Sequence, residues 1–429
     1  MNYSECINYL YNSLPVYQRI GAPAYKANLN NTIALMQHLQ NPETKFPSIH
    51  IGGTNGKGSV SHNLASIYQE AGYKTGLYTS PHLKDFRERI RINGKKISKK
   101  FIVDFTEKNK SFFEEINPSF FEMTVAMAFM YFAKEQVDIA IVEVGMGGRL
   151  DSTNVIKPQL SIITNISRDH TQFLGNTLQD IAREKAGIIK ENTPVIIGET
   201  QTETEEIFIQ TAKEKNAPIV FADKLFQTEK EKTLLKHDGF WMKFTAKTQD
   251  KPYEKYISPL AGTYQLNNFK TILAACQFTE KKKLTKKQIK DGIKNCIFNT
   301  NLMGRWQVLQ QQPLSIADTG HNEAGIKLIV EQLSQLKYDK LHIVLSMVND
   351  KDISKILSLL PKTAIYYFCK ANIPRGLNPH ELQSKAQEFG LNGKVYASVK
   401  KAYNTAKLTA QKNDLIFAGG STFTVAEVF

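Results

Sequence analysis

The stretch from His50 to Val60 reads HIGGTNGKGSV, and it decides how the chain is interpreted. The apolar run Pro47–Ile51 overlaps its start and predicts a short buried strand, and the pattern of Ser59–Ala71 predicts a helix. Between them, glycines allow backbone N–H groups to turn inward, and the helix N-terminus adds its positive end. Lys57 supplies a charge suited to β- and γ-phosphates. The stretch therefore predicts a phosphate-binding loop.

The loop departs from the strict Walker pattern in two places. Ile51 stands where the pattern has its first glycine, and Gly58 separates Lys57 from Ser59. A glycine-rich surface turn with an incidental lysine is therefore the alternative interpretation.

Two further strands are predicted to end near this loop. Asp138–Asn154 predicts a strand ending in Glu143, with a glycine turn after it, and Leu160–Gly175 predicts a strand ending in Asp169 and His170. A helical pattern over 181–190 holds Lys185. Because loops at the carboxyl ends of strands in a parallel sheet converge, we expect these groups at one edge. Oxygen ligands beside phosphates are what a magnesium–nucleotide site needs.

Motifs in the same order along the chain extend this interpretation: HIGGTNGKGSV, TSPHL…FRERIRING, FFEMT, EVGMGGRLDSTN, DHTQFLGNT, IAREKAGI, GTYQLNN, GRW, DTGHN and AGGSTFTVAEV. Together they resemble the folylpolyglutamate synthase/dihydrofolate synthase family of Mur-ligase-like, ATP-dependent amide-forming ligases. The resemblance runs from about Ala24 to the end. The form GTNGKGS favours the folate branch over peptidoglycan ligases, which resemble GTxGKT.

The resemblance implies ligation of L-glutamate to dihydropteroate and to reduced folates. ATP would activate the folate carboxylate as an acyl phosphate, which the amine of glutamate would then displace. A folylpolyglutamate synthase without the first activity is the nearest alternative, and a peptidoglycan-type ligase is more distant. From another class, the chain would be a nucleotide-binding module without ligase activity.

The resemblance also implies roles for particular residues. The expected catalytic residues are Lys57, His170, Lys185 and His321. The expected nucleotide-binding residues are Asn55, Gly56, Lys57, Gly58, Ser59, Val60, Asn268, Arg305 and Asp318. The expected magnesium ligands, for two ions, are Ser59, Ser80, Glu143 and His170. The expected pterin-binding residues are Tyr25, Phe120, Phe121 and Leu150.

Several of these residues have a second interpretation. Ser80 before a proline is often only a turn residue, and His170 beside Asp169 is a helix-capping pair. Lys185 matches the family's carbamylated lysine, whereas the alternative interpretation is an ordinary helix lysine paired with Glu184. Phe120 and Phe121 are equally consistent with core residues.

The chain departs from the family pattern at three positions. Tyr264 stands where many relatives have histidine, and Glu323 stands where a proline is usual after Asn322. Arg305 keeps only part of its motif, because the residues common before it in relatives are absent.

Length and composition limit the class of protein. A chain of 429 residues, 41% hydrophobic and 22% charged, indicates a soluble protein of two domains. We see no signal peptide, no run of about 20 apolar residues and no disulfide-type cysteine spacing, so a cytoplasmic protein is expected. The net charge of +14 suits polyanionic substrates, and nucleic-acid binding is the weaker alternative. The resemblance implies a monomer without membrane or nucleic-acid partners.

The alternation of strands and helices predicts an α/β fold: a P-loop parallel-sheet ATPase domain followed by a smaller Rossmann-like α/β domain. The boundaries are 1–299, with an N-terminal helical segment, and 300–429, with a hinge near Thr300–Gly304. Segments around 218–221, 239–242 and 253–257 are expected to form an added hairpin. The second domain is expected to have strands near 314–317, 341–346, 364–369, 394–397 and 414–418.

Overall fold

A computed structural model describes residues 1–14, 28–249, 251–278, 284–349 and 353–429. The chain forms two compact units, each built from several segments. Unit 1 comprises Met1–Glu231, Lys243–Ser258 and Gln265–Leu302, and unit 2 comprises Lys232–Met242, Pro259–Tyr264 and Met303–Phe429. The division at 299/300 made from the sequence remains a prediction about domains.

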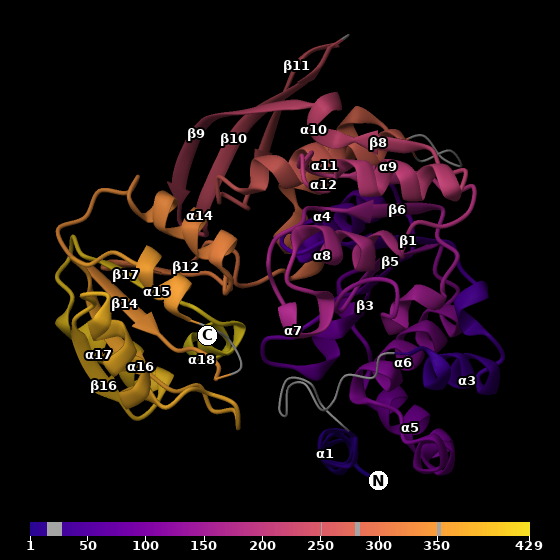
Figure 1. The fold of residues 1–429 in the computed structure, drawn as a ribbon, viewed down its shortest axis with the longest axis horizontal. Helices are drawn as coiled ribbons and strands as arrows, with labels where there is room; N and C mark the ends of the chain where they lie inside the picture. Colours follow the sequence, from indigo (N-terminus) through magenta and orange to yellow (C-terminus); the bar gives the residue numbers. More distant parts are fainter. Residues whose placement is uncertain (15–27, 250, 279–283, 350–352) are drawn as a thin grey trace. The chain divides into compact units, whose positions relative to one another are not determined.

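Unit 1 is built around a mainly parallel sheet with the strand order β4-β3-β2-β5-β1-β6-β7-β8 (Figure 1). Strands β2, β5, β1, β6, β7 and β8 run parallel, and β3 and β4 add antiparallel pairs at one end. The carboxyl ends of the parallel strands therefore lie at one edge. The strands are β1 Ser48–Gly52, β2 Thr75–Tyr78, β3 Ile90–Ile92, β4 Lys95–Lys96, β5 Ile139–Glu143, β6 Leu160–Ile163, β7 Val195–Ile197 and β8 Ile219–Phe221.

Both faces of this sheet are covered, so its central strands are buried throughout. On one face, Ala140 and Val142 of β5 lie in a core with helices α1, α3, α5 and α6. Helix α4, which is not part of that core, packs against β1, β2 and β5. A second core lies where α8 and α9 cover β6 and β7. The helices are α1 Tyr3–Ser13, α3 Asn30–His38, α4 Lys57–Glu70, α5 Lys99–Ile116, α6 Phe120–Lys134, α7 Thr171–Leu174, α8 Leu178–Ala186, α9 Glu205–Glu214, α10 Ala222–Leu225, α11 Gln265–Gln277, α12 Lys286–Lys294 and α13 Cys296–Thr300. Short 3-10 turns span Pro42–Thr44, Phe86–Arg89 and Ser152–Val155.

The break between α5 and α6 follows from local chemistry. Asn117 ends α5 in the left-handed conformation, with φ 46°, and Pro118 follows it. Ser119 then caps α6 by accepting a hydrogen bond from the backbone N–H of Glu122, whose side chain bonds back to Ser119. The sequence predicts two helical stretches over Phe101–Ala133, separated at Asn117–Pro118, and this prediction is confirmed.

A small sheet with the strand order β11-β10-β9 follows the main sheet of unit 1 in the chain. Its strands are β9 Gln227–Lys236, β10 Gly239–Thr248 and β11 Lys251–Ser258. The prediction that residues 218–221 belong to this addition is wrong, because β8 pairs in parallel with β7. The run Gln227–Lys236 is mostly exposed and charged, so its pattern gave little sign of a strand.

Unit 2 contains a second sheet with the strand order β12-β13-β17-β14-β15-β16. All its neighbouring pairs are parallel except β12 with β13. Helix α17 packs on β14, β15 and β16, and α16 packs on β15 and β16 (Figure 1). This arrangement confirms the predicted smaller α/β unit. Its elements are β12 Gln307–Gln311, β13 Leu314–Ala317, α14 Glu323–Leu333, β14 Leu341–Leu345, α15 Ser354–Leu359, β15 Ile365–Cys369, α16 Pro379–Glu388, β16 Gly393–Tyr396, α17 Val399–Thr409, β17 Leu415–Gly419 and α18 Thr422–Val428.

Within the described residues, every helix is too short or too polar to cross a membrane.

Candidate active site

The glycine loop joins β1 to α4 as the sequence predicts, although α4 begins at Lys57, two residues before the predicted start. Gly56 precedes the helix with φ 87°, a left-handed conformation that favours glycine. A Cβ at this position would stand 2.2 Å from Oδ1 of Asn268. Asn268 of α11 therefore lies directly against the loop.

The first turn of α4 carries the other predicted loop residues. Ser59 is buried, and its hydroxyl accepts a hydrogen bond of 3.1 Å from Nε2 of Gln265. The side-chain oxygen Oε1 of Gln265 in turn accepts a hydrogen bond of 2.7 Å from Nδ2 of Asn268. The N–H of Val60 donates to the carbonyl of Gly56 over 2.9 Å, so the helix itself uses that group.

The segment after β6 holds the glycine loop from the other side. Asn165 accepts from the N–H of Thr54 through its backbone oxygen (2.8 Å) and from the N–H of Asn55 through its Oδ1 (3.0 Å). The Thr164 hydroxyl donates to the carbonyl of Asn55 over 2.6 Å. The predicted strand ending in Asp169 and His170 is wrong in its length. β6 ends at Ile163 because the chain then turns to bond the loop.

Two lysines meet at one carbonyl of the loop. Lys57 donates to the backbone oxygens of Gly53 (3.1 Å) and Thr54 (3.0 Å), and Lys185 donates to that of Gly53 over 2.8 Å. Lys185 is only 4% exposed. Burial, with the nearby Lys57 charge, lowers the pKa of Lys185 to about 7, although Asp169 and Asp151 oppose the shift.

Glu184 does not pair with Lys185, so the interpretation of Lys185 as an ordinary helix lysine paired with Glu184 is wrong. Its carboxylate binds Arg149 instead, with an Nη2–Oε1 distance of 2.7 Å. Gly148 allows the turn to approach α8, because a Cβ there would stand 2.7 Å from the carbonyl oxygen of Glu184. The glycine turn and α8 therefore hold the Lys185 side chain toward the phosphate loop.

Glu143 ends β5 with a carboxylate that is 4% exposed. It accepts a hydrogen bond of 3.0 Å from the backbone N–H of Ser80, which follows β2. A carboxylate and a hydroxyl are donors that suit Mg²⁺. Among the described residues, no cluster of three or more His, Cys, Asp or Glu side chains forms a metal cage. This donor set fits an ion that keeps several waters and shares phosphate oxygens.

His170 precedes α7 in a left-handed conformation, with φ 51°. Its N–H donates to Oδ1 of Asp169 over 2.9 Å, and its Nε2 lies 3.9 Å from Oδ2 of the same carboxylate. The His170 side chain makes no capping hydrogen bond to α7.

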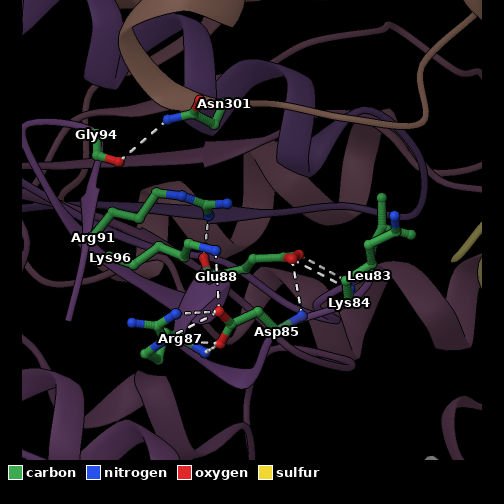
Figure 2. Close-up of polar contacts among 9 residues, drawn as sticks. All are labelled: Leu83, Lys84, Asp85, Arg87, Glu88, Arg91, Gly94, Lys96 and Asn301. Atoms are coloured by element: carbon green, nitrogen blue, oxygen red, sulfur yellow. Dashed lines mark hydrogen bonds and ion pairs between the residues drawn. The ribbon is translucent and has the colours of Figure 1, made fainter. Parts of the chain in front are cut away.

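The segment after Ser80 is held by two carboxylates (Figure 2). Glu88 accepts from the N–H groups of Leu83, Lys84 and Asp85 over 2.8, 3.2 and 2.9 Å. Asp85 binds Arg87 and Lys96, which hold the pKa of its carboxyl below the usual range although burial opposes them. The motif FRERIRING thus shapes the loop that carries Ser80.

A buried network fixes the turn after Glu143. Asp151 accepts hydrogen bonds from the N–H groups of Met146 (2.8 Å) and Thr153 (3.0 Å), and burial raises its pKa. The Thr153 hydroxyl also bonds Nε2 of His50 over 2.8 Å. Burial lowers the pKa of His50 to about 3, so this imidazole stays neutral and links β1 to the turn.

The aromatic pair at the start of α6 divides into two environments. Phe120 is 3% exposed and stacks on Tyr11, with ring centroids 5.0 Å apart and the Arg89 guanidinium 5.3 Å from its centroid. Phe121 is half-buried and lies against Gly145, where a Cβ would stand 2.3 Å from its ring. Leu150 is also half-buried. Tyr25 lies outside the described residues.

A second cluster lies in unit 2. Asp318 accepts from the Tyr264 hydroxyl (2.6 Å) and from the N–H groups of Trp306 (2.7 Å) and Gly320 (2.9 Å). Arg305 donates to the Thr319 hydroxyl, and Nδ1 of His321 bonds the Thr319 carbonyl over 3.0 Å. Arg305, Asp318 and His321 therefore come together through Thr319 and its neighbours.

Several residues that shape these sites were not singled out from the sequence. In the structure, Asn165 and Glu199 follow strands β6 and β7 by two residues, and Gln265 begins α11. Tyr264 was noted only as a departure from the family, and the structure shows it bound to Asp318.

Comparison with known proteins places both units in one class. Residues 51–276 match the Mur ligase middle domain, and residues 304–422 match the Mur ligase glutamate ligase domain. Dihydrofolate synthase/folylpolyglutamate synthase of Bacillus subtilis is 34% identical over 360 residues, which cover 82% of each chain.

Solved structures agree over the full length. E. coli FolC in complex with DHPP and ADP has a TM-score of 0.86 and 29% identity, covering 100% of this chain and 97% of that chain. The bifunctional folylpolyglutamate synthase/dihydrofolate synthase of Yersinia pestis, complexed with AMPPNP and Mn ion, has a TM-score of 0.82 and 27% identity, with the same coverage. The chain therefore belongs to the dihydrofolate synthase/folylpolyglutamate synthase family of Mur ligases. The resemblance drawn from the motifs and the predicted fold class are confirmed.

Proposed function

We propose that this chain is an ATP-dependent ligase that joins L-glutamate to dihydropteroate and, in further cycles, to reduced folates. The observation that carries this proposal is the convergence of Lys57, Lys185 and the Glu143–Ser80 pair beside a glycine phosphate loop, in a member of this family. The substrates are small molecules: ATP, L-glutamate, dihydropteroate and reduced folates.

The loop residues bind and orient ATP. Lys57 leaves the Gly53 and Thr54 carbonyls to contact the β- and γ-phosphates, with N–H groups from Gly56 to Ser59 around it. Asn268 contacts the adenine side, and Arg305 and Asp318 also serve the nucleotide. The γ-phosphoryl group moves to the folate carboxylate, and the glutamate amine then displaces phosphate from the acyl phosphate. Neutralising charge on the transferred group is the main catalytic task.

Mg²⁺, when bound, would neutralise phosphate charge and align the reacting oxygens. Glu143 and Ser80 would hold one ion together with Ser59, and His170 would serve a second. Glu143 is suited to this role because its carboxylate is buried at the strand end, where a bound cation would offset its charge.

Lys185 is proposed to carry a carbamate. A lysine with a pKa near 7 is largely a neutral amine at slightly alkaline pH, and the neutral amine adds to CO₂ with loss of a proton. The product carries a negative charge where the ammonium stood beside Lys57, so charge repulsion becomes attraction. Its oxygens would orient the metal ligands.

Tyr25, Phe120, Phe121 and Leu150 are proposed to bind the pterin, as the family resemblance implies. His321 is proposed to serve the glutamate side of the reaction. A cytoplasmic monomer without nucleic-acid partners is expected. On α12, Lys286 and Lys290 pair with Glu254 at 2.6 and 2.7 Å, so these two basic side chains already have an acidic partner, which weakens the nucleic-acid alternative.

The test is ADP release by purified protein with MgATP and L-glutamate, with dihydropteroate and tetrahydrofolate offered separately. Turnover with both establishes the bifunctional enzyme, and turnover with tetrahydrofolate alone establishes the chain-extending alternative. Lys57→Met should abolish release. Absence of folate-dependent release at any bicarbonate concentration contradicts the proposal and leaves a nucleotide-binding protein.

A further inference from the structure

Glu199 follows β7 and lies between two segments that hold the phosphate loop. Its Oε1 accepts a hydrogen bond of 3.0 Å from Nδ2 of Asn165, and the Asn267 side chain of α11 helps to lower the pKa of Glu199. Gly198 permits this approach, because a Cβ there would stand 2.3 Å from the Thr164 carbonyl oxygen. The position of Glu199 is therefore set by close backbone packing.

The bond to Glu199 sets the orientation of the Asn165 amide. Its NH₂ group points to the carboxylate, so its oxygen faces the N–H of Asn55, 3.0 Å away. A flipped amide would place two donors against each other at Asn55. An ionised carboxylate only accepts hydrogen bonds, so Glu199 favours the orientation that holds the phosphate loop.

Helix α11 lies beside the same carboxylate. Asn267 accepts from Nζ of Lys270 over 3.0 Å, and both residues help to lower the pKa of Glu199. The next residue, Asn268, lies against Gly56.

We propose that Glu199 is a positioning residue for nucleotide binding, acting through Asn165 on the phosphate loop. The inference rests on the proposed function, because it takes the loop to bind ATP. Burial and the charge of Asp223 raise the pKa of Glu199, whereas Asn165, Lys270 and Asn267 lower it.

The proposal is tested in the full-length chain by exchanging the hydrogen-bond donor at position 165 and the acceptor at position 199. The affinity for MgADP is measured by calorimetry. Asn165→Asp places two carboxylates together, so we expect ADP affinity to fall about tenfold. Adding Glu199→Gln to that variant supplies an amide donor, and affinity should return to within about threefold of the original chain. The KM for L-glutamate should change less than ADP affinity in both variants.

Asp223→Asn is the matched control, because Asp223 bonds Thr200 (2.7 and 2.8 Å) beside Glu199. Its ADP affinity should stay within about twofold of the original chain, since one acceptor oxygen remains. Unchanged affinity in Asn165→Asp, no recovery in the folded double variant, or an equal loss in the control would overturn the inference. Failure of the unsubstituted chain to bind MgADP would overturn the proposed function as well.

Discussion

Lys185 and Lys57 share the Gly53 carbonyl, and this contact makes a chemical prediction. Because the pKa of Lys185 is about 7, its neutral amine fraction increases as pH rises through 7. In ¹³C-labelled bicarbonate at pH 8, NMR should detect one protein carbamate that is absent from Lys185→Met. A spectrum identical in both proteins would remove the carbamate from the mechanism.

The same lysine predicts how stability depends on pH in CO₂-free buffer. Its pKa is lower in the folded chain, about 7, than its ordinary value of 10.5, so burying the charge destabilises the fold most at pH below 7. The penalty decreases as pH rises from 7 toward 10.5. The melting temperature of the original chain, relative to Lys185→Met, should therefore increase over this range. A constant difference would show that Lys185 is solvated.

Substitutions at two glycines with similar backbone angles distinguish the effect of backbone strain from that of steric contact. Gly56 has φ 87° and faces Asn268, whereas Gly72 has φ 84°, and no other part of the described chain comes within 4 Å of where its Cβ would stand. Either substitution by alanine should destabilise the fold by about 1 kcal/mol through the backbone. Gly56→Ala should also weaken MgADP binding at least about tenfold because Asn268 must move. Equal ADP affinities would place Asn268 elsewhere in solution.

Side-chain chemistry was easier to predict than hydrogen-bond partners. Glu143 was recognisable because a charged residue within an apolar pattern needs a reason. Lys185 was recognised only because it matches the family's carbamylated lysine. Their partners, the Ser80 N–H and the Gly53 carbonyl, are backbone groups from distant segments. Backbone partners leave no mark in residue type, so the sequence had no means of indicating them.

At the level of secondary structure, the cap of α6 connects folding to the pterin residues. Ser119→Ala removes the hydrogen bond to Glu122 and should lower the free energy of unfolding by about 1 kcal/mol. Because Phe120 and Phe121 form the first turn, the KM for the folate substrate should also rise.

Ser98→Ala on α5 is the matched control. Ser98 caps its helix through the N–H of Phe101 over 3.1 Å, so its loss should cost similar stability. The KM for folate should not change in this variant. Equal KM values in both variants would argue against a substrate role for the α6 terminus. Urea unfolding and steady-state kinetics measure the two effects.

The elements that were predicted well have strong periodicity or clear punctuation, such as the Asn117–Pro118 break. The two errors have physical causes. The apolar sequence pattern of β6 continues past the last strand residue, Ile163. Ile166 is buried by packing rather than by strand pairing, so the pattern predicts too long a strand. In β8, a short run of three residues carries no information on which sheet it joins. Pairing of that kind depends on tertiary contacts.

For the molecule as a whole, ligand binding should appear as thermal stability. MgADP at about 100 times its Kd should stabilise the folded chain by about 2.7 kcal/mol. Because few protein groups are proposed to hold the metal ion, EDTA should remove it and with it most of the gain in stability. Differential scanning calorimetry with MgADP, ADP plus EDTA, and buffer alone measures this. An EDTA-resistant gain would contradict a metal role in nucleotide binding.

Unit 2 is assembled from segments that are separated in the chain. Asp318 depends on Tyr264 for one hydrogen bond, and the N–H of Thr263 donates to Gln332 over 2.8 Å. During synthesis on the ribosome, Pro259–Tyr264 therefore emerges well before the residues it will bind. A chimera that exchanges only residues 304–422 would separate Asp318 from its native tyrosine. Recombination between relatives should thus succeed more often when the short upstream segment travels with the C-terminal one.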